Sequence, residues 1–112
     1  MLKAVLATLV ATVLMALGPA AVAADPAIVI ISHPVADFAA WKKRFDAGKE
    51  MRDKAGLTQR YVMRDADQPN VVIVVFEASL ENAKKFVSDP GFRERVKKAS
   101  SSGSAEIKLA IQ

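Results

Sequence analysis

Two kinds of hydrophobic pattern alternate along the chain after residue 24. Apolar side chains fill every position of 28–31 and of 71–76, which is typical of strands that are buried on both faces. Residues 57–64 and 105–111 alternate instead between two sets of side chains, as in strands with one face toward solvent. The pattern predicts four strands, of which 28–31 and 71–76 are the most deeply buried.

Helical periodicity separates these strands. One apolar stripe recurs every three or four positions from Phe38, through Trp41 and Phe45, and predicts a helix that begins after Asp37 and continues to about residue 54. A second stripe follows Ser79 and consists of Leu80, Ala83, Phe86 and Val87. Asp89 and Pro90 restart a helical turn, whose buried face continues through Phe92, Val96 and Ala99.

The predicted order is β-α-β-β-α-β, which is the ferredoxin-like arrangement of the α+β class. It implies a four-stranded antiparallel sheet with two helices on one face, and with 28–31 and 71–76 at its centre. Two helices cover one face only, so apolar side chains of the central strands remain on the other. We therefore expect a two-fold homodimer with the sheets packed face to face, the alternative being a monomer whose open face reflects strand propensity alone.

The first 24 residues have the layout of a secretory signal peptide. Lys3 gives a short positive start, residues 4–17 are apolar except for threonines, and Gly18-Pro19 precede small residues up to Ala24. We expect cleavage after Ala23 or Ala24 and a bacterial periplasmic or secreted protein, free of the membrane, whose domain spans 25–112. A retained anchor is the alternative, although the run is shorter than the roughly 20 residues that span a bilayer.

Composition narrows the possible chemistry. Residues 25–112 carry 15 basic and 12 acidic side chains, and the basic ones form no block interleaved with aromatics, so we expect no nucleic-acid partner. The chain has no cysteine, which excludes disulfides, thiolate metal sites and a cysteine nucleophile. A single histidine excludes a multi-histidine metal cage. We predict neither a metal nor a cofactor.

His33 is the candidate general base, because it is the one side chain with an ordinary pKa near neutrality. It lies where the first strand is expected to end, and the alternative is a turn histidine that contacts water or backbone. Arg60 and Arg64 are expected on one face of the 57–64 strand, where they would hold a carboxylate or phenolate. The alternative for both arginines is a solvated strand edge or ion pairs.

Two aromatic side chains are further candidates for a ligand pocket. Trp41 falls in the helical stripe with Phe38 and Phe45, so a place in the core competes with a place in the pocket. Tyr61 shares a strand face with Leu57 and Met63 and is equally compatible with packing under a helix. Met51 and Met63 are expected to fill the core.

Several short stretches resemble the dimeric α+β barrel superfamily. They are His33–Phe38, Trp41-Lys42, Phe45-Asp46, Arg64-Asp65, Pro69–Val72 and Ala83–Phe86. Within that superfamily the chain is similar to small proteins related to antibiotic-biosynthesis-type monooxygenases and to cyclases. The resemblance implies a dimer with a pocket between sheet and helices or inside the barrel.

Three functions are compatible with these features. The first is an exported dimeric protein that binds a small, partly apolar or anionic ligand. The second is a cofactor-independent monooxygenase or cyclase, with His33 as general base and Arg60 or Arg64 as anion stabiliser. The third is a structural or interaction module without a ligand.

Overall fold

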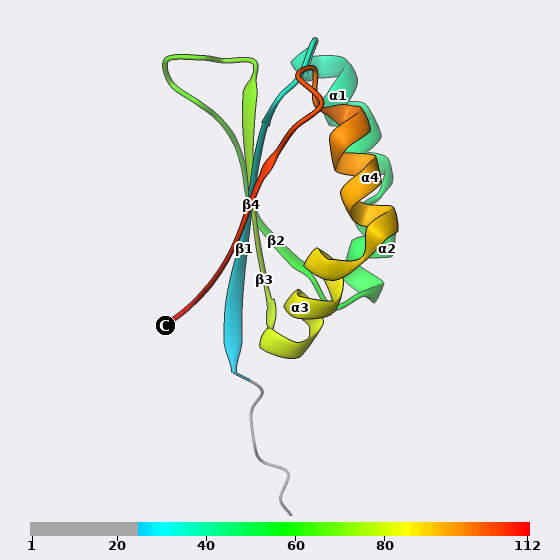
Figure 1. The fold of residues 1–112 in the computed structure, drawn as a ribbon, viewed down its shortest axis with the longest axis vertical. Coiled ribbons are helices and arrows are strands. Elements are labelled where there is room, and N and C mark those ends of the chain that lie inside the picture. Colours follow the sequence, from blue (N-terminus) through cyan, green and yellow to red (C-terminus); the bar gives the residue numbers. More distant parts are fainter. Residues whose placement is uncertain (1–24) are drawn as a thin grey trace, which may run out of the picture.

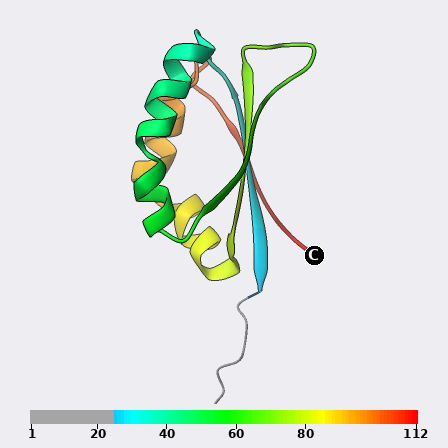
Figure 2. The same cartoon turned by 180° about the vertical axis from the view of Figure 1, so that it is seen from behind.

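The computed structural model describes residues 25–112, so the predicted signal peptide lies outside the described part. Strands β1 (Pro26–Pro34), β2 (Thr58–Arg64), β3 (Val71–Ser79) and β4 (Glu106–Ile111) form one sheet. Helices α1 (Phe38–Ala47) and α2 (Lys49–Lys54) follow β1, and α3 (Leu80–Ser88) and α4 (Pro90–Ala99) follow β3. Figures 1 and 2 show all four helices on one side of the sheet. None of these helices is long and apolar enough to cross a membrane.

The sheet confirms the predicted topology. Its strand order is β2-β3-β1-β4, and every neighbouring pair is antiparallel. The two strands that are apolar at every position of 28–31 and 71–76 therefore lie at the centre, and the alternating strands lie at the edges. The core between sheet and helices is built on side chains that are almost completely buried, namely Val29, Leu57, Val72, Val74 and Phe76.

The helical layer differs from the expected two helices, because each one is broken. Gly48 ends α1 and opens α2, and its backbone N–H donates to the carbonyl oxygen of Phe45. A glycine gains less from continuing a helix than other residues do, so the chain bends there at little cost. The second break, at Asp89, was predicted: the Asp89 carboxylate accepts from the N–H groups of Gly91 and Phe92 and caps α4.

A β-bulge in β2 changes which face its side chains point to. Gln59 pairs with Phe76, but the next paired residue is Tyr61, which lies opposite Val75. Arg60 is therefore an extra residue without a partner in the ladder, and it shifts the alternation of everything after it. Tyr61 and Met63 consequently lie on the face away from the helices, and the expectation that Met63 fills the core is wrong.

The sheet face away from the helices is apolar along its centre. Ile28 and Ile30 of β1 and Ile73 and Val75 of β3 alternate with the buried residues of these strands and are half-buried. Tyr61, Met63 and Ala110 extend this surface toward the sheet edges. We call this set of seven residues the open face.

Candidate functional site

A large cleft lies between the helices and the sheet. Its volume is about 1130 Å³, and it opens between the α1–α2 pair on one side and the α3–α4 pair on the other. Ile31 and His33 of β1 and Val74 and Phe76 of β3 line it from the sheet. This volume is slightly above the roughly 300–1,000 Å³ that ligand pockets commonly occupy, so the cleft has room for a small organic ligand.

Aromatic rings form much of the cleft wall. Trp41 and Phe45 are stacked with their centroids 4.8 Å apart, and Phe45 lies 6.2 Å from Phe76. On the opposite side Phe86 meets Phe76 edge to face at 6.0 Å and lies 4.0 Å from Phe92. Trp41 is both a core residue and a lining residue, so the two interpretations of its role are compatible.

His33 is buried, with 5% of its surface exposed, and points toward the helices from inside β1. His33 was expected where the first strand ends, and β1 does end one residue after it, at Pro34. The Nδ1 atom lies 3.2 Å from the carbonyl oxygen of Pro34, so a proton on Nδ1 leaves the lone pair on Nε2. Burial lowers the pKa of His33 from its usual 6.5, and the contact with Pro34 offsets this only in part. The imidazole is therefore neutral at pH 7.

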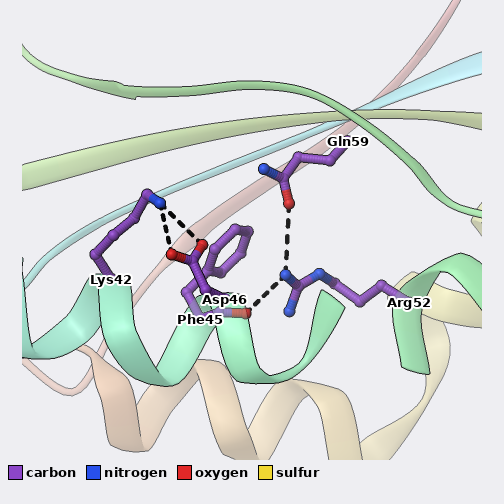
Figure 3. A network of polar contacts seen from close by, with 5 residues as sticks. All are labelled: Lys42, Phe45, Asp46, Arg52 and Gln59. Atoms are coloured by element: carbon purple, nitrogen blue, oxygen red, sulfur yellow. Dashed lines mark hydrogen bonds and ion pairs between the residues drawn. The ribbon is translucent and has the colours of Figure 1, made fainter. Parts of the chain in front are cut away.

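Arg52 of α2 reaches into the cleft and is held there by the preceding helix. Its Nη2 atom donates to the carbonyl oxygen of Phe45 at 2.7 Å and lies 3.5 Å from Oε1 of Gln59 (Figure 3). Its guanidinium carbon lies 3.8 Å from the centroid of the Phe45 ring, a cation–π distance. The Nε atom is buried and has no hydrogen-bond partner within residues 25–112, which costs about 1–3 kcal/mol.

Gly48 makes room for this guanidinium. A Cβ atom at position 48 would lie 2.8 Å from Nη1 of Arg52. The residue that breaks the predicted helix therefore also allows the arginine to lie against the helix end.

The cleft is cationic where it meets solvent. Its lining includes one acidic residue, Asp89, and six basic residues: Arg44, Arg52, Lys54, Lys85, Arg95 and Lys98. The four helices together carry twelve Lys and Arg but only five Asp and Glu side chains. Since the charges of the domain are segregated onto this layer, its potential attracts anions toward the cleft.

The other predicted site residues lie elsewhere. Arg60 and Arg64 were expected on one face of β2, which is wrong because Arg60 occupies the bulge. Arg60 pairs with Glu77 at 2.7 Å, and Arg64 lies over the Phe38 ring at 4.4 Å and donates to the carbonyl oxygen of Pro69. Tyr61 is 61% exposed on the open face. None of these three side chains lines the cleft between helices and sheet.

Arg52 is the residue that sequence reasoning missed. Continuous helical periodicity through Gly48 puts Arg52 outside the apolar stripe that contains Met51. The stripe assigned Met51 to the core, but Met51 is exposed at the cleft mouth. A glycine in the middle of a predicted helix was the available signal, because a break there changes the direction of every later side chain.

Metal-ligating side chains are not clustered in the described part of the chain. No group of three or more His, Cys, Asp or Glu side chains within residues 25–112 is placed to hold a metal ion. The charged and polar side chains that line the cleft are basic, apart from neutral His33, Asn82 and Ser88 and the carboxylate of Asp89.

Comparison with protein families settles the relationship of the chain. Residues 24–105 match the model of a domain of unknown function, DUF3764. The chain belongs to this family. Curated proteins offer no significant match to this DUF3764 chain.

Solved structures share the fold at low sequence identity. A mutant form of SnoaB, a cofactor-independent oxygenase from Streptomyces nogalater, matches with a TM-score of 0.62 and 16% identity over 80% of this chain and 94% of its own. A protein from Nitrosomonas europaea named as a candidate antibiotic biosynthesis monooxygenase has a TM-score of 0.60 and 12% identity, covering 81% and 93% of the two chains. A dimeric ferredoxin-like protein from an uncultured marine organism has a TM-score of 0.51 and 13% identity, covering 79% and 88%. These neighbours confirm the ferredoxin-like fold of the DUF3764 chain and its structural resemblance to the monooxygenase-type superfamily.

Proposed function

We propose that this protein binds a small, partly apolar anionic molecule in the cleft between its helices and its sheet. The observation that carries the proposal is the combination of stacked aromatic rings inside the cleft with six basic side chains among its lining residues. The aromatic wall favours a ligand that prefers to leave water, and the basic residues favour one that carries negative charge.

The two parts of the cleft contribute in different ways. A bicyclic aromatic ring that buries about 200 Å² would gain about 5 kcal/mol from leaving water, before the cost of association is subtracted. The exposed cations of the rim contribute less to affinity, because solvent and salt screen them. They raise the rate of encounter and select the sign of the ligand charge.

Calorimetry with 2-naphthoate, a planar aromatic carboxylate, tests the proposal. Ala99 lines the cleft from an exposed position of α4, so Ala99→Phe should fill part of the space without disturbing the core. We expect this variant to weaken binding at least tenfold. Ala40→Phe is the matched control, since Ala40 is exposed on α1 and does not line the cleft. Absence of binding, or equal binding by both variants, would contradict the proposal.

His33 supports a second candidate, which is cofactor-independent oxygenation. Its neutral imidazole lines the cleft, and Nε2 is free to accept a proton when Nδ1 carries one. As a general base it would take the O–H proton of a phenol or enol and leave a phenolate or enolate. The negative charge is shared with a carbon atom of the substrate, and dioxygen, the co-substrate, is the oxidant that accepts electrons from that carbon. The fold of SnoaB, a cofactor-independent oxygenase, is compatible with such chemistry.

Oxygen consumption with a dihydroxynaphthoate distinguishes the two candidates. Under the enzyme hypothesis the protein accelerates oxygen uptake over the uncatalysed rate, and His33→Ala loses this acceleration while it still binds 2-naphthoate. Under the binding hypothesis the wild type consumes no extra oxygen. Binding in the cleft is a premise of both candidates, so the calorimetric experiment comes first.

A homodimer through the open face is part of the proposal. Ile28, Ile30, Ile73 and Val75 present half-buried apolar side chains there, and a second copy would remove them from water. One structural neighbour is a dimeric ferredoxin-like protein, which supports the formation of a dimer. The cleft lies on the other side of the sheet, so dimerisation would leave it accessible.

Export to the bacterial periplasm or the exterior completes the proposal and rests on the sequence pattern of residues 1–24. The intact mass of the protein, expressed with its full chain in a bacterium, tests it. We expect the mass of a chain that begins at Ala24 or Asp25, recovered from the periplasmic fraction. A chain of 112 residues in the membrane fraction would support a retained anchor instead.

A further inference from the structure

We propose that Arg52 selects a planar aromatic carboxylate for the cleft, an inference that rests on the binding function proposed above. Arg52 differs from the other basic lining residues because its guanidinium is fixed. Hydrogen bonding to the Phe45 carbonyl oxygen and stacking on the Phe45 ring hold it in one orientation. A fixed guanidinium recognises an anion with less loss of side-chain entropy than a mobile lysine does.

The donors of Arg52 are only partly used. The buried Nε atom has no acceptor within residues 25–112, and Nη2 has only a long second contact, 3.5 Å to Oε1 of Gln59. These two nitrogens lie on the same side of a guanidinium and form the fork that binds both oxygens of a carboxylate. A ligand carboxylate that displaces the Gln59 contact would therefore satisfy Nε and keep Nη2 paired.

The charge of Arg52 is not neutralised by the acids nearest to it. Asp46 is paired with Lys42 at 2.7 Å, as Figure 3 shows, and Asp53 is paired with Lys49 at 2.8 Å. Each acid is thus engaged by a lysine four residues away in the sequence. Arg52 itself forms no ion pair within the described chain, so it retains a positive charge for a ligand.

The surroundings of the guanidinium favour a flat ligand. Trp41, Phe45 and Arg52 form a stack, with 4.8 Å between the two ring centroids and 3.8 Å from Phe45 to the guanidinium. An aromatic ring packs well beside such a stack, and its carboxylate lies in the plane of the ring. A carboxylate matches the two-pronged geometry of one guanidinium, whereas a tetrahedral phosphate presents further oxygens that one fork does not satisfy.

The test compares 2-naphthoate with its neutral amide, 2-naphthamide, by calorimetry. Two variants of the full domain remove the anion site in different ways. Arg52→Gln removes the charge, and Gln59→Glu supplies an internal carboxylate that competes with the ligand for Arg52. Lys43→Gln is the control, because Lys43 lies exposed on the same helical layer, does not line the cleft, and its loss removes the same charge.

We expect the wild type to prefer the acid over the amide at least tenfold. Arg52→Gln and Gln59→Glu should each weaken binding of the acid at least tenfold and change the affinity for the amide by less than twofold. Lys43→Gln should change both by less than twofold. Circular dichroism melting confirms that each variant is folded before binding is compared.

Equal weakening of acid and amide by Arg52→Gln would overturn the inference, because Arg52 would then only maintain the shape of the cleft. If Lys43→Gln weakens binding of the acid as much as Arg52→Gln does, the inference would also be overturned. The preference for the acid would then come from the overall positive potential of the helices. In both cases the wild type still binds and Ala99→Phe still blocks, so the proposed function stands. A wild type that binds neither compound would contradict the proposed function itself, and this inference with it.

Discussion

The imidazole of His33 meets the indole of Trp41 edge to face, with ring centroids 6.1 Å apart and an angle of 73° between the planes. The pair joins the central strand β1 to helix α1 across the floor of the cleft. These are the single histidine and the single tryptophan of the chain, so each gives an unambiguous spectroscopic signal. The contact therefore links the candidate base to a reporter beside it.

The first prediction concerns the protonation of His33. Burial lowers the pKa of this imidazole, so its NMR titration should have a midpoint below the usual 6.5. Tryptophan fluorescence should change over the same pH range, because a protonated imidazole quenches a neighbouring indole. A midpoint at or above 6.5 would show that the ring is solvated and would remove the physical basis of its role as a neutral base.

The second prediction follows by linkage. Below pH 6.5 the unfolded chain takes up a proton at His33 that the folded protein resists, so the free energy of unfolding should fall as the pH drops toward the folded-state pKa. Well above pH 6.5 both states are neutral and His33 contributes no pH dependence. His33→Gln should remove this component of the pH dependence of the free energy of unfolding. Urea unfolding of the wild type and the variant at several pH values measures it. Parallel curves for the two proteins would contradict the prediction.

The third prediction separates stability from ligand recognition at Gly48. Its backbone angles, φ −92° and ψ 2°, are accessible to alanine, so Gly48→Ala should leave the melting temperature within a few degrees of the wild type. The new Cβ would press on Nη1 of Arg52 and displace the guanidinium from the Phe45 ring. We expect weaker binding of 2-naphthoate with unchanged binding of 2-naphthamide. Retained binding of the acid would show that the position of Arg52 is not critical.

The fourth prediction compares two glycines with positive φ. Gly56 (φ 85°) ends the α2 segment, and a Cβ there would collide with the Asn82 side chain; Gly103 (φ 78°) has open space around it. Alanine at either position costs about 1–2 kcal/mol for the left-handed backbone, and the collision adds to this at position 56. Denaturant unfolding should therefore give a lower free energy of unfolding for Gly56→Ala than for Gly103→Ala.

A double variant checks the cause of that ranking. Adding Asn82→Ala to Gly56→Ala removes the colliding atoms and should recover part of the lost stability. If stability does not recover, backbone strain accounts for the whole loss of stability in Gly56→Ala. The comparison also matters for the site, because Asn82 lines the cleft from α3.

The sheet was predictable because its signals are local. The β-branched run at 28–31 and the apolar run at 71–76 predict strands that are apolar on both faces, and both strands lie at the centre of the observed order. The helix starts after Asp37, Ser79 and Asp89 were also predictable from local sequence. Each of these side chains accepts a hydrogen bond from a backbone N–H within the next three residues.

The candidate site was less predictable because it depends on irregularities. The bulge at Arg60 adds one residue to an alternating pattern, and one residue is enough to send Tyr61 to the opposite face. Arg52 reaches the cleft because the helix breaks at Gly48, and Arg52 then packs on Phe45 of the previous helix. Which residues line the cleft thus depends on how the two helix pairs are separated in three dimensions. The periodicity of the sequence does not predict this separation.

The fifth prediction tests the open face. Ile73 lies near its centre on β3, half-buried in the single chain. If two sheets pack face to face, Ile73→Lys buries a charge without a partner at the contact and should dissociate the dimer. Sedimentation equilibrium should give twice the mass of the mature chain for the wild type and once that mass for the variant. Ala66→Lys is the control, because Ala66 is exposed in the turn between β2 and β3. A wild type that remains monomeric at high concentration would contradict the face-to-face arrangement. Strand propensity alone would then explain why Ile73 and Val75 are apolar. The cleft on the other side of the sheet would keep its geometry.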